Sequence, residues 1–433
     1  MDCLISKTEI LKFIFIFTAA HDEVQKEVKI YANNFQMNSQ WIASIPCIAF
    51  SIIAGALSDV FGRKPLMLYP LVGYFLASLI NIINYAFIDT LPLEFFYLNK
   101  ISSFFGGYAI FTLGVYVYGT TVTKPEERTY RFLRFDGMFT LSNITGTLVS
   151  PYIFDYMGYY GNYILSSACY ALAIIHLVFF VKEPIETKPQ APLTNNLNDK
   201  NLISKLKEIF LTAVIIPLGS MKEVVTKDRK STVKLLITLQ LLCYFLYAFT
   251  SQVSRLVYLY MLLIFDGFTG KDYAHLSVVM LLVRTVVLLF IMPIISSKLK
   301  VHDALLITIL NGIEVVAAIA KPFTTTLWEF YFAYVLGSIG FCKFGIIRSL
   351  LSKCIDQDEI GKVFSFLAII SAFGPMAGNP VFRQLYNYTL SIYPGAMFLC
   401  FAAFLFIAVC AMGFVYFKRH EIGHQQEEKN NNF

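Results

Sequence analysis

The stretch GALSDVFGRKP (55–65) places one acid, two bases and two glycines between two long apolar runs of the chain. Glycines permit a tight turn and a close approach of neighbouring helices. A carboxylate such as Asp59 can cap the N-terminus of a nearby helix and hold Arg63 in a charge-assisted hydrogen bond. This composition indicates a short polar loop that ties two apolar helices together.

The composition of the whole chain indicates a membrane protein. Of its 433 residues, 57% are hydrophobic and 15% are charged, whereas soluble proteins carry about a quarter charged residues. The net charge of +6 is distributed over short clusters between apolar runs, which argues against a nucleic-acid partner. The eight cysteines form no CxxC pair and lie mostly in apolar runs, so we interpret them as packing residues and predict no metal site.

Apolar runs recur along the chain and are bounded by charged residues, which predicts an all-α membrane protein with about 11 to 12 transmembrane helices. We expect spans at 38–57, 66–88, 96–120, 134–154, 161–181, 233–258, 273–296, 303–321, 326–347, 361–384 and 389–417.

The distribution of polar residues predicts how these spans are grouped. The longest polar interval separates the fifth span from the sixth, and we interpret it as a linker. The predicted organisation is a truncated N-terminal segment 1–37, an N-terminal helical bundle 38–182, a cytoplasmic linker 183–232, a C-terminal helical bundle 233–417 and a cytoplasmic tail 418–433.

The N-terminal run ILKFIFIFTAA (10–20) is too short to cross a bilayer. As a helix it would span about 17 Å, against a hydrocarbon core of about 30 Å. We interpret it as the remnant of a lost span, because a further span would make the two halves equal. The apolar core of a signal peptide is the alternative.

Basic residues are concentrated in alternate loops. One set of loops holds most of the lysines and arginines, including those of 55–65, of 124–134 and of the linker, whereas the other set is acidic or mixed. The positive-inside rule therefore predicts that 55–65, the linker and the C-terminus are cytoplasmic.

The loop between the first two predicted spans resembles the signature G-x-L-x-D-x-x-G-[RK]-[RK] of the major facilitator superfamily. The matching residues are Gly55, Leu57, Asp59, Gly62, Arg63 and Lys64. The resemblance implies two pseudo-repeated helical bundles, a substrate site between them near the middle of the membrane, and a loop that latches one conformation. An ordinary positive-inside loop is the alternative interpretation.

Four segments in the same order resemble the proton-coupled folate transporter family, solute carrier family 46. They are EVQKEV (23–28), GALSDVFGRK (55–64), IRSLLSK (347–353) and YPGAMFL (393–399). The resemblance implies a transporter of organic anions that uses a proton gradient. It also implies a first span that family members have before EVQKEV.

The same resemblance marks two candidate functional residues. Asp136, five residues after Arg131 at the start of a predicted span, matches an acidic residue of the family and is the proton-coupling candidate. A carboxylate in a poorly hydrated cavity has a raised pKa and can exchange a proton near neutral pH. Arg348 matches an arginine implicated in substrate or proton coupling, and a guanidinium suits a carboxylate. The alternatives are that Asp136 pairs with Arg131 or Arg134, and that Arg348 only anchors the chain beside Lys353.

Glu314 and Arg284 are candidates from geometry alone. Arg284 lies 12 residues from Ser296 and Glu314 lies 11 residues from Asp303, at the two ends of the short loop that joins their spans, which places both at a depth of about 16–18 Å. An unpaired charge at such a depth is costly, so we predict an ion pair between Glu314 and Arg284 with a structural role or a part in binding.

These observations predict a secondary active transporter of a small organic solute, with an organic anion as the expected cargo and protons as the candidate coupling ion. A membrane scaffold that has lost transport is the alternative. The chain contains no HExxH, GxSxG or phosphate-binding loop, so we do not expect an enzyme or a cofactor. We expect a multi-pass protein of the plasma membrane or an endolysosomal membrane.

Overall fold

The computed structural model describes residues 35, 38–51, 54, 62–183, 231–299, 301–355, 359–390 and 392–419, and these residues form helices and turns without a β-strand. Within them, nine helical stretches are long and apolar enough to cross a membrane. The predicted all-α membrane fold is confirmed. Most of the N-terminal segment 1–37, nearly all of the linker and the end of the tail lie outside the described residues, as do Gly55, Leu57 and Asp59.

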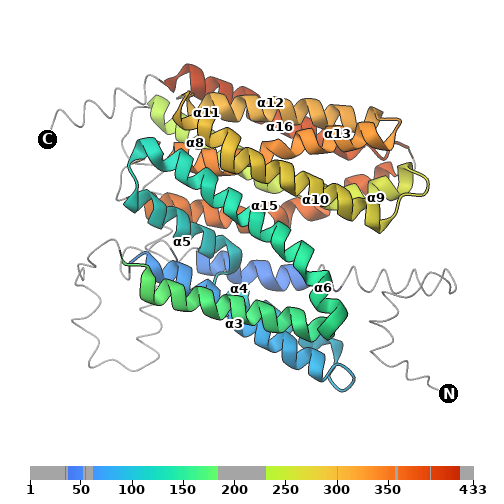
Figure 1. Ribbon diagram of the computed structural model, residues 1–433. Helices are drawn as coiled ribbons and strands as arrows, with labels where there is room; N and C mark the ends of the chain where they lie inside the picture. The colour runs from blue at the N-terminus through green and yellow to red at the C-terminus, as the bar shows by residue number, and fades with distance from the viewer. Residues whose placement is uncertain are drawn as a thin grey trace.

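The first group of helices follows the predicted spans and ends in a long hairpin. After a helix at 38–51 come α3 (Lys64–Ala86), η1 (Leu93–Lys100), α4 (Ile101–Phe104), α5 (Gly107–Val122) and α6 (Pro125–Phe180). The two arms of α6 meet at Gly158, whose φ of 61° lies in the left-handed region that favours glycine. A single element therefore supplies two spans (Figure 1).

The second group of helices is interrupted by short segments of tighter or wider helix. It consists of α8 (Ser231–Thr250), α9 (Val253–Ile264), α10 (Gly270–Val286), η2 (Val287–Ile291), α11 (Met292–Ser297), α12 (Asp303–Ala320), η3 (Lys321–Phe323), α13 (Leu327–Ser338), η4 (Ile339–Cys342), α14 (Lys343–Cys354), α15 (Ile360–Thr389) and α16 (Ala396–Phe417). Of these, η2 is a π-helical turn, a feature that often occurs at functional sites.

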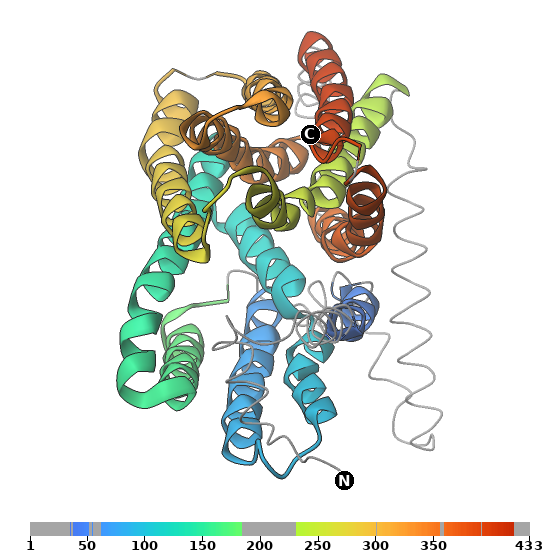
Figure 2. The same ribbon diagram turned by 90° about the vertical axis from the view of Figure 1, so that its right-hand side faces the viewer.

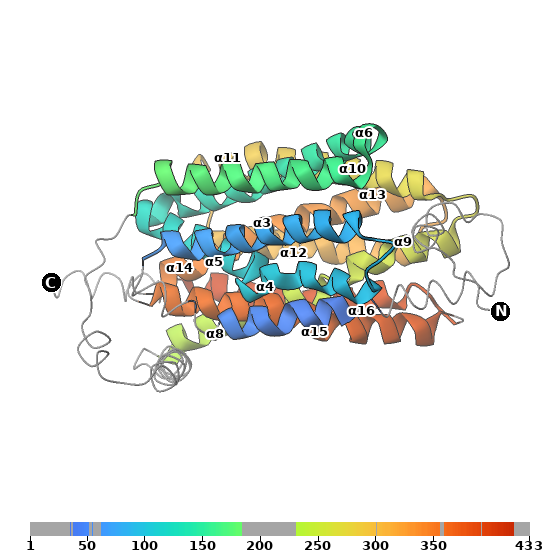
Figure 3. The same cartoon turned by 90° about the horizontal axis from the view of Figure 1, so that it is seen from below.

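The helices run roughly parallel to one long axis (Figure 3), and the view along that axis separates the two groups (Figure 2). The groups meet where α6 contacts α10, α11 and α14, and where α5 contacts α15. We call the end of the bundle that carries Gly62, Arg63 and Lys64 the motif end. The opposite end, which carries Lys100 and Lys321, is called the far end.

The described part of the signature loop binds a carboxylate. The backbone N–H groups of Arg63 and Lys64 each donate to Glu183 at 2.8 Å, and Lys64 Nζ donates to the carbonyl oxygen of Val178 at 2.7 Å. These N–H groups open α3, where the helix dipole favours a negative charge. Gly62 has a φ of 93°, and a side chain at this position would collide with Glu183. The loop thus joins the start of α3 to the end of α6.

The helix that contains the fourth predicted span, 134–154, starts before that span. The helix begins at Pro125, since proline fits the first turn of a helix and the acids Glu126 and Glu127 favour its N-terminus. Asp136 therefore lies about 17 Å inside α6 instead of at its start.

We predict that Glu183→Gln destabilises the protein by about 1 kcal/mol, because a neutral amide is a weaker partner than a carboxylate for the N–H groups that begin a helix. Thermal unfolding of the detergent-solubilised protein measures the effect. Arg131→Gln is the control, because its ion pair with Glu127, at 3.5 Å, is exposed and contributes little. Equal unfolding temperatures for Glu183→Gln and the unmodified protein would contradict the capping role.

Candidate functional site

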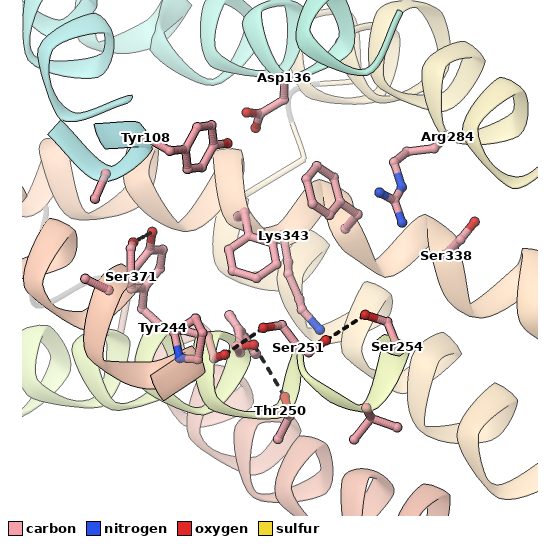
Figure 4. A pocket seen from close by; sticks show the side chains of 18 of the residues that line it. Tyr108, Asp136, Tyr244, Thr250, Ser251, Ser254, Arg284, Ser338, Lys343 and Ser371 are labelled. Carbon is pink, nitrogen blue, oxygen red and sulfur yellow. Dashed lines mark hydrogen bonds between the residues drawn. The ribbon is translucent and has the colours of Figure 1, made fainter. Parts of the chain in front are cut away.

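A cavity of about 670 Å³ lies between the two groups of helices (Figure 4). It extends from Asp136 and Arg348 in the middle of the bundle to Lys100 and Lys321 at the far end. Its wall is rich in aromatic and hydroxyl side chains, including Tyr74, Tyr108, Tyr244, Tyr247, Ser251, Ser254, Tyr334, Ser338, Phe341, Phe344, Ser371 and Phe398. Such a mixture of apolar surface with a few placed polar groups is typical of small-molecule sites.

Asp136 lines this cavity with one half of its carboxylate unsatisfied. It is 5% exposed, and Tyr116 of α5 donates its hydroxyl to Oδ1. Oδ2 has no hydrogen-bond partner among the described residues. It faces Gly345 of α14, where a side chain would collide with it. Glycine at position 345 therefore leaves the space that the carboxylate occupies.

Arg348 of α14 is connected to Asp136 through the aromatic side chain of Tyr116. It is 8% exposed, and its Nη2 donates to the hydroxyl of Tyr244 at 2.6 Å. Its guanidinium lies 4.4 Å from the ring centroid of Tyr116, the residue that bonds Asp136. Arg348 is thus buried among side chains of both groups of helices. The alternative that it only anchors the chain at the surface does not hold.

The alternative partners of Asp136 are engaged elsewhere. Arg131 pairs with Glu127 at the surface, and the guanidinium of Arg134 lies 4.4 Å from the ring centroid of Tyr130. Both arginines are exposed on the surface of α6, whereas Asp136 is buried and points into the bundle.

The predicted ion pair between Glu314 and Arg284 is wrong, since Glu314 of α12 pairs with Lys343 of α14. The guanidinium of Arg284 lies 4.2 Å from the ring centroid of Phe341 instead. Counting residues gave the depth of Arg284 along its helix but not its direction. The π-helical turn η2 between Arg284 and the loop changes that direction.

Two lysines that line the cavity, Lys343 and Lys321, were not among the predicted site residues. Lys343 lies inside a predicted span, and its ammonium lies 4.4 Å from the ring centroid of Tyr247. Lys321 looks like a loop residue, yet it is only 6% exposed and lies 5.2 Å and 5.6 Å from the ring centroids of Tyr334 and Phe398. A lysine flanked by long apolar runs was the available signal.

The charges that line the cavity do not balance. Its two acids are Asp136 and Glu314, and its five bases are Lys100, Arg284, Lys321, Lys343 and Arg348. Within the described part of the chain, no group of three or more His, Cys, Asp or Glu residues could hold a metal ion. The cavity is therefore a site of net positive charge without a metal centre among these residues.

At the motif end, the two groups of helices are joined by a polar cluster around Thr129 of α6. The Thr129 hydroxyl lies 2.9 Å and 3.0 Å from the two carboxylate oxygens of Asp303 and 2.7 Å from the hydroxyl of Ser349. Lys353 Nζ donates to Thr129 at 2.8 Å and to Asp303 at 2.7 Å. We call Thr129, Asp303, Ser349 and Lys353 the motif-end cluster.

Arg128, the neighbour of Thr129, also joins the two groups of helices at the motif end. It is 2% exposed, and it donates through Nη1 to the carbonyl oxygen of Ser352 at 2.7 Å and through Nη2 to that of Thr120 at 3.2 Å. Hydrogen bonds to a charged donor are stronger than neutral ones. The cavity is therefore closed toward the motif end.

The contacts that join the groups at the far end are weaker. The side-chain oxygen of Gln40 accepts from Asn379 at 3.2 Å and from the exposed Arg255 at 3.3 Å. No ion pair joins the two groups at this end within the part of the chain that the structure describes. The bundle is thus asymmetric along its axis, tightly joined at one end and hollow toward the other.

Comparison with known proteins gives the chain a context. Residues 35–379 match the Major Facilitator Superfamily. A probable peptidoglycan muropeptide transporter of Drosophila melanogaster is 24% identical over 92% of this chain and 75% of its own length. The lysosomal proton-coupled steroid conjugate and bile acid symporter of Homo sapiens is 25% identical over 95% of this chain and 85% of its own. A proton-coupled folate transporter of Bos taurus is 21% identical over 90% of this chain and 81% of its own length.

Solved structures share the fold. The human organic anion transporter MFSD10 superposes with a TM-score of 0.67 at 14% identity, covering 94% of this chain and 89% of its own. The proton:xylose symporter XylE superposes with a TM-score of 0.63 at 13% identity, covering 94% of this chain and 90% of its own. At these identities the likeness concerns the fold alone.

The observed ion pair predicts a specific pattern of stability. Glu314→Ala should cost about 3–5 kcal/mol, because it leaves the buried ammonium of Lys343 uncompensated. Lys343→Ala should cost less, because Arg284 and Lys321 remain within electrostatic range of Glu314. The double variant should cost less than the sum of the two, whereas Glu314→Ala combined with Arg284→Ala should show a weaker coupling, because Arg284 is within electrostatic range of Glu314 but is not bonded to it. Unfolding temperatures of the solubilised variants measure both cycles. Coupling to Arg284 in place of Lys343 would contradict the pairing.

Proposed function

We propose that this chain, which belongs to the major facilitator superfamily, is a secondary transporter that moves a small organic anion by alternating access. The observation that carries the proposal is the excess of basic over acidic side chains lining a cavity that is closed at one end. Its relatives are solute transporters and not enzymes, which supports this reaction class.

The wall of the cavity favours an anion with an apolar body. Charges in a poorly hydrated cavity interact more strongly than in water, so a carboxylate gains most where buried cations surround it. The aromatic wall can contact the rest of the solute. Arg348 is suited to the anionic group, since a guanidinium can bind a carboxylate with two parallel hydrogen bonds.

Asp136 is the residue that we propose for proton coupling. Its Oδ2 is buried without a hydrogen-bond partner in the described chain, and this atom would carry the proton in the protonated form. Protonation would remove the negative charge near Arg348 and leave the guanidinium to the solute. Proton binding and anion binding would then favour each other, as linkage requires of two coupled sites.

The motif end is proposed to face the cytoplasm. Arg63, Lys64, Arg128 and Lys353 lie there, and the positive-inside rule assigns such an end to the cytoplasmic side. The cavity then opens toward the outside of the cell or the lumen of an endolysosome, and the C-terminus is cytoplasmic. In the opposite state the motif-end cluster would separate.

Asp136→Asn should abolish the stimulation of uptake by acid, because an amide cannot exchange a proton. The measurement is uptake of radiolabelled organic anions, including folate and peptide-derived anions, at about pH 5.5 and pH 7.4 in cells expressing the chain. The unmodified protein should transport faster at the acidic pH, and the variant should show one low rate at both. Full acid stimulation in the variant would contradict the role of Asp136. A chain that reaches the surface and transports nothing would favour the scaffold instead.

Arg348→Lys should weaken transport although the charge is kept, since an ammonium cannot form the paired hydrogen bonds of a guanidinium. We expect the KM for the anion to rise about tenfold, which corresponds to about 1.4 kcal/mol. Arg131→Lys is the matched control, because Arg131 lies exposed on the outer part of α6. An unchanged KM in Arg348→Lys would show that Arg348 does not contact the anion.

A further inference from the structure

Three cations of the cavity, Lys100, Arg284 and Lys321, remain without an acid once its two carboxylates are assigned, and Arg284 and Lys321 belong to the same group of helices as Glu314. Asp136 lies within electrostatic range of Arg348, and Glu314 is bonded to Lys343. Neither Arg284 nor Lys321 has a carboxylate oxygen within ion-pair distance in the described part of the chain. Both line the cavity.

Glu314 cannot serve as the missing partner of both. It lies within electrostatic range of Arg284 and of Lys321, but its hydrogen bond goes to Lys343. One carboxylate can neutralise only one of these three cations. The part of the cavity that they surround therefore carries an excess of two positive charges.

The aromatic rings around these cations do not replace an anion. The guanidinium of Arg284 lies 4.2 Å from the ring centroid of Phe341, and the ammonium of Lys321 is more than 5 Å from the rings of Tyr334 and Phe398. A cation over a ring gains about 0.5–2 kcal/mol, whereas removing an ion from water costs several kcal/mol. In addition, Nε of Arg284 is buried without a hydrogen-bond partner in the described chain.

Both cations border the same face of the cavity. Lys321 lies against Tyr334, and Arg284 lies against Phe341 and within electrostatic range of Tyr334. Tyr334 and Phe341 are seven residues apart on the helical stretch formed by α13 and η4, which is about 10 Å. Figure 4 shows the guanidinium of Arg284 directed into the cavity near Ser338, which lies between them in sequence.

We propose that Arg284 and Lys321 form a second anion subsite, apart from Arg348, so that the transported solute carries two negative charges on an apolar body. This inference rests on the proposed function and narrows it to dianions. A solute with two charges would neutralise the excess that the protein leaves uncompensated. A monoanion would fill one subsite and leave the positive charge of the other subsite uncompensated.

The test uses two probes of the same shape that differ by one charge. Biphenyl-4,4′-dicarboxylate is a dianion at about pH 7.4, and its monomethyl ester is a monoanion. Binding of each to the purified full chain is measured by the ligand-induced shift of its unfolding temperature. The dianion should bind at least about tenfold more tightly.

The variants assign that preference to the two cations. Lys321→Gln and Arg284→Gln should each bind the dianion about tenfold more weakly and leave the affinity for the monoanion nearly unchanged. Lys321→Arg should retain the preference, which shows that a folded site with charge is sufficient. Lys298→Gln, which removes an exposed cation at the motif end, is the control and should bind both probes like the unmodified chain.

The outcomes separate the two proposals. Equal binding of both probes, or a preference that survives in Lys321→Gln and Arg284→Gln, would overturn the second subsite and leave anion transport standing. Failure of the folded chain to bind either probe, together with failure to take up any organic anion, would contradict the proposed function and the subsite with it.

Discussion

The hydroxyl of Thr129 is the point on which the architecture depends. It lies among Asp303, Ser349 and Lys353, so one threonine of α6 is bound by two helices of the other half. Because this cluster is buried and charge-assisted, it holds the halves together at one end. The space between them opens toward the other end, where the hydrogen bonds that join the halves in the described chain are those of Gln40. The direction of the cavity therefore follows from where the halves are bonded.

The cost of burying charge in a membrane bundle explains how the cavity is lined. Lipid-facing helix surfaces carry apolar side chains, and ionisable residues face the interior, where they can be compensated. Glu314 with Lys343 is one compensated pair, and Asp136 near Arg348 is a second, looser one. Arg284 and Lys321 exceed what the protein compensates by itself. We propose that these uncompensated cations bind the anionic solute, and that the unsatisfied oxygen of Asp136 binds the coupling proton.

The sequence predicted the fold well and the site in part, for a physical reason. A bilayer imposes a long apolar run on each span, so the spans were visible in the composition, and Gly62 to Lys64 marked the motif end. Depth along a helix could also be counted, which placed Glu314 and Arg284 inside the bundle. The direction in which each side chain points could not be predicted by counting residues, because it depends on the π-helical turn η2 and on the interrupted helix before Lys343. Asp303 and Thr129 looked like ordinary polar residues because their partnership exists only between distant helices.

Transport by alternating access requires the motif-end cluster to open and close. Thr129→Cys combined with Ser349→Cys places two thiols where two hydroxyl oxygens are 2.7 Å apart, and an oxidant should link them across the two halves. Oxidation should stop uptake and a reducing agent should restore it, whereas each single-cysteine variant should keep its own rate of uptake under both conditions. Undiminished uptake by a fully cross-linked double variant would show that the halves need not separate there, and would contradict alternating access through this cluster.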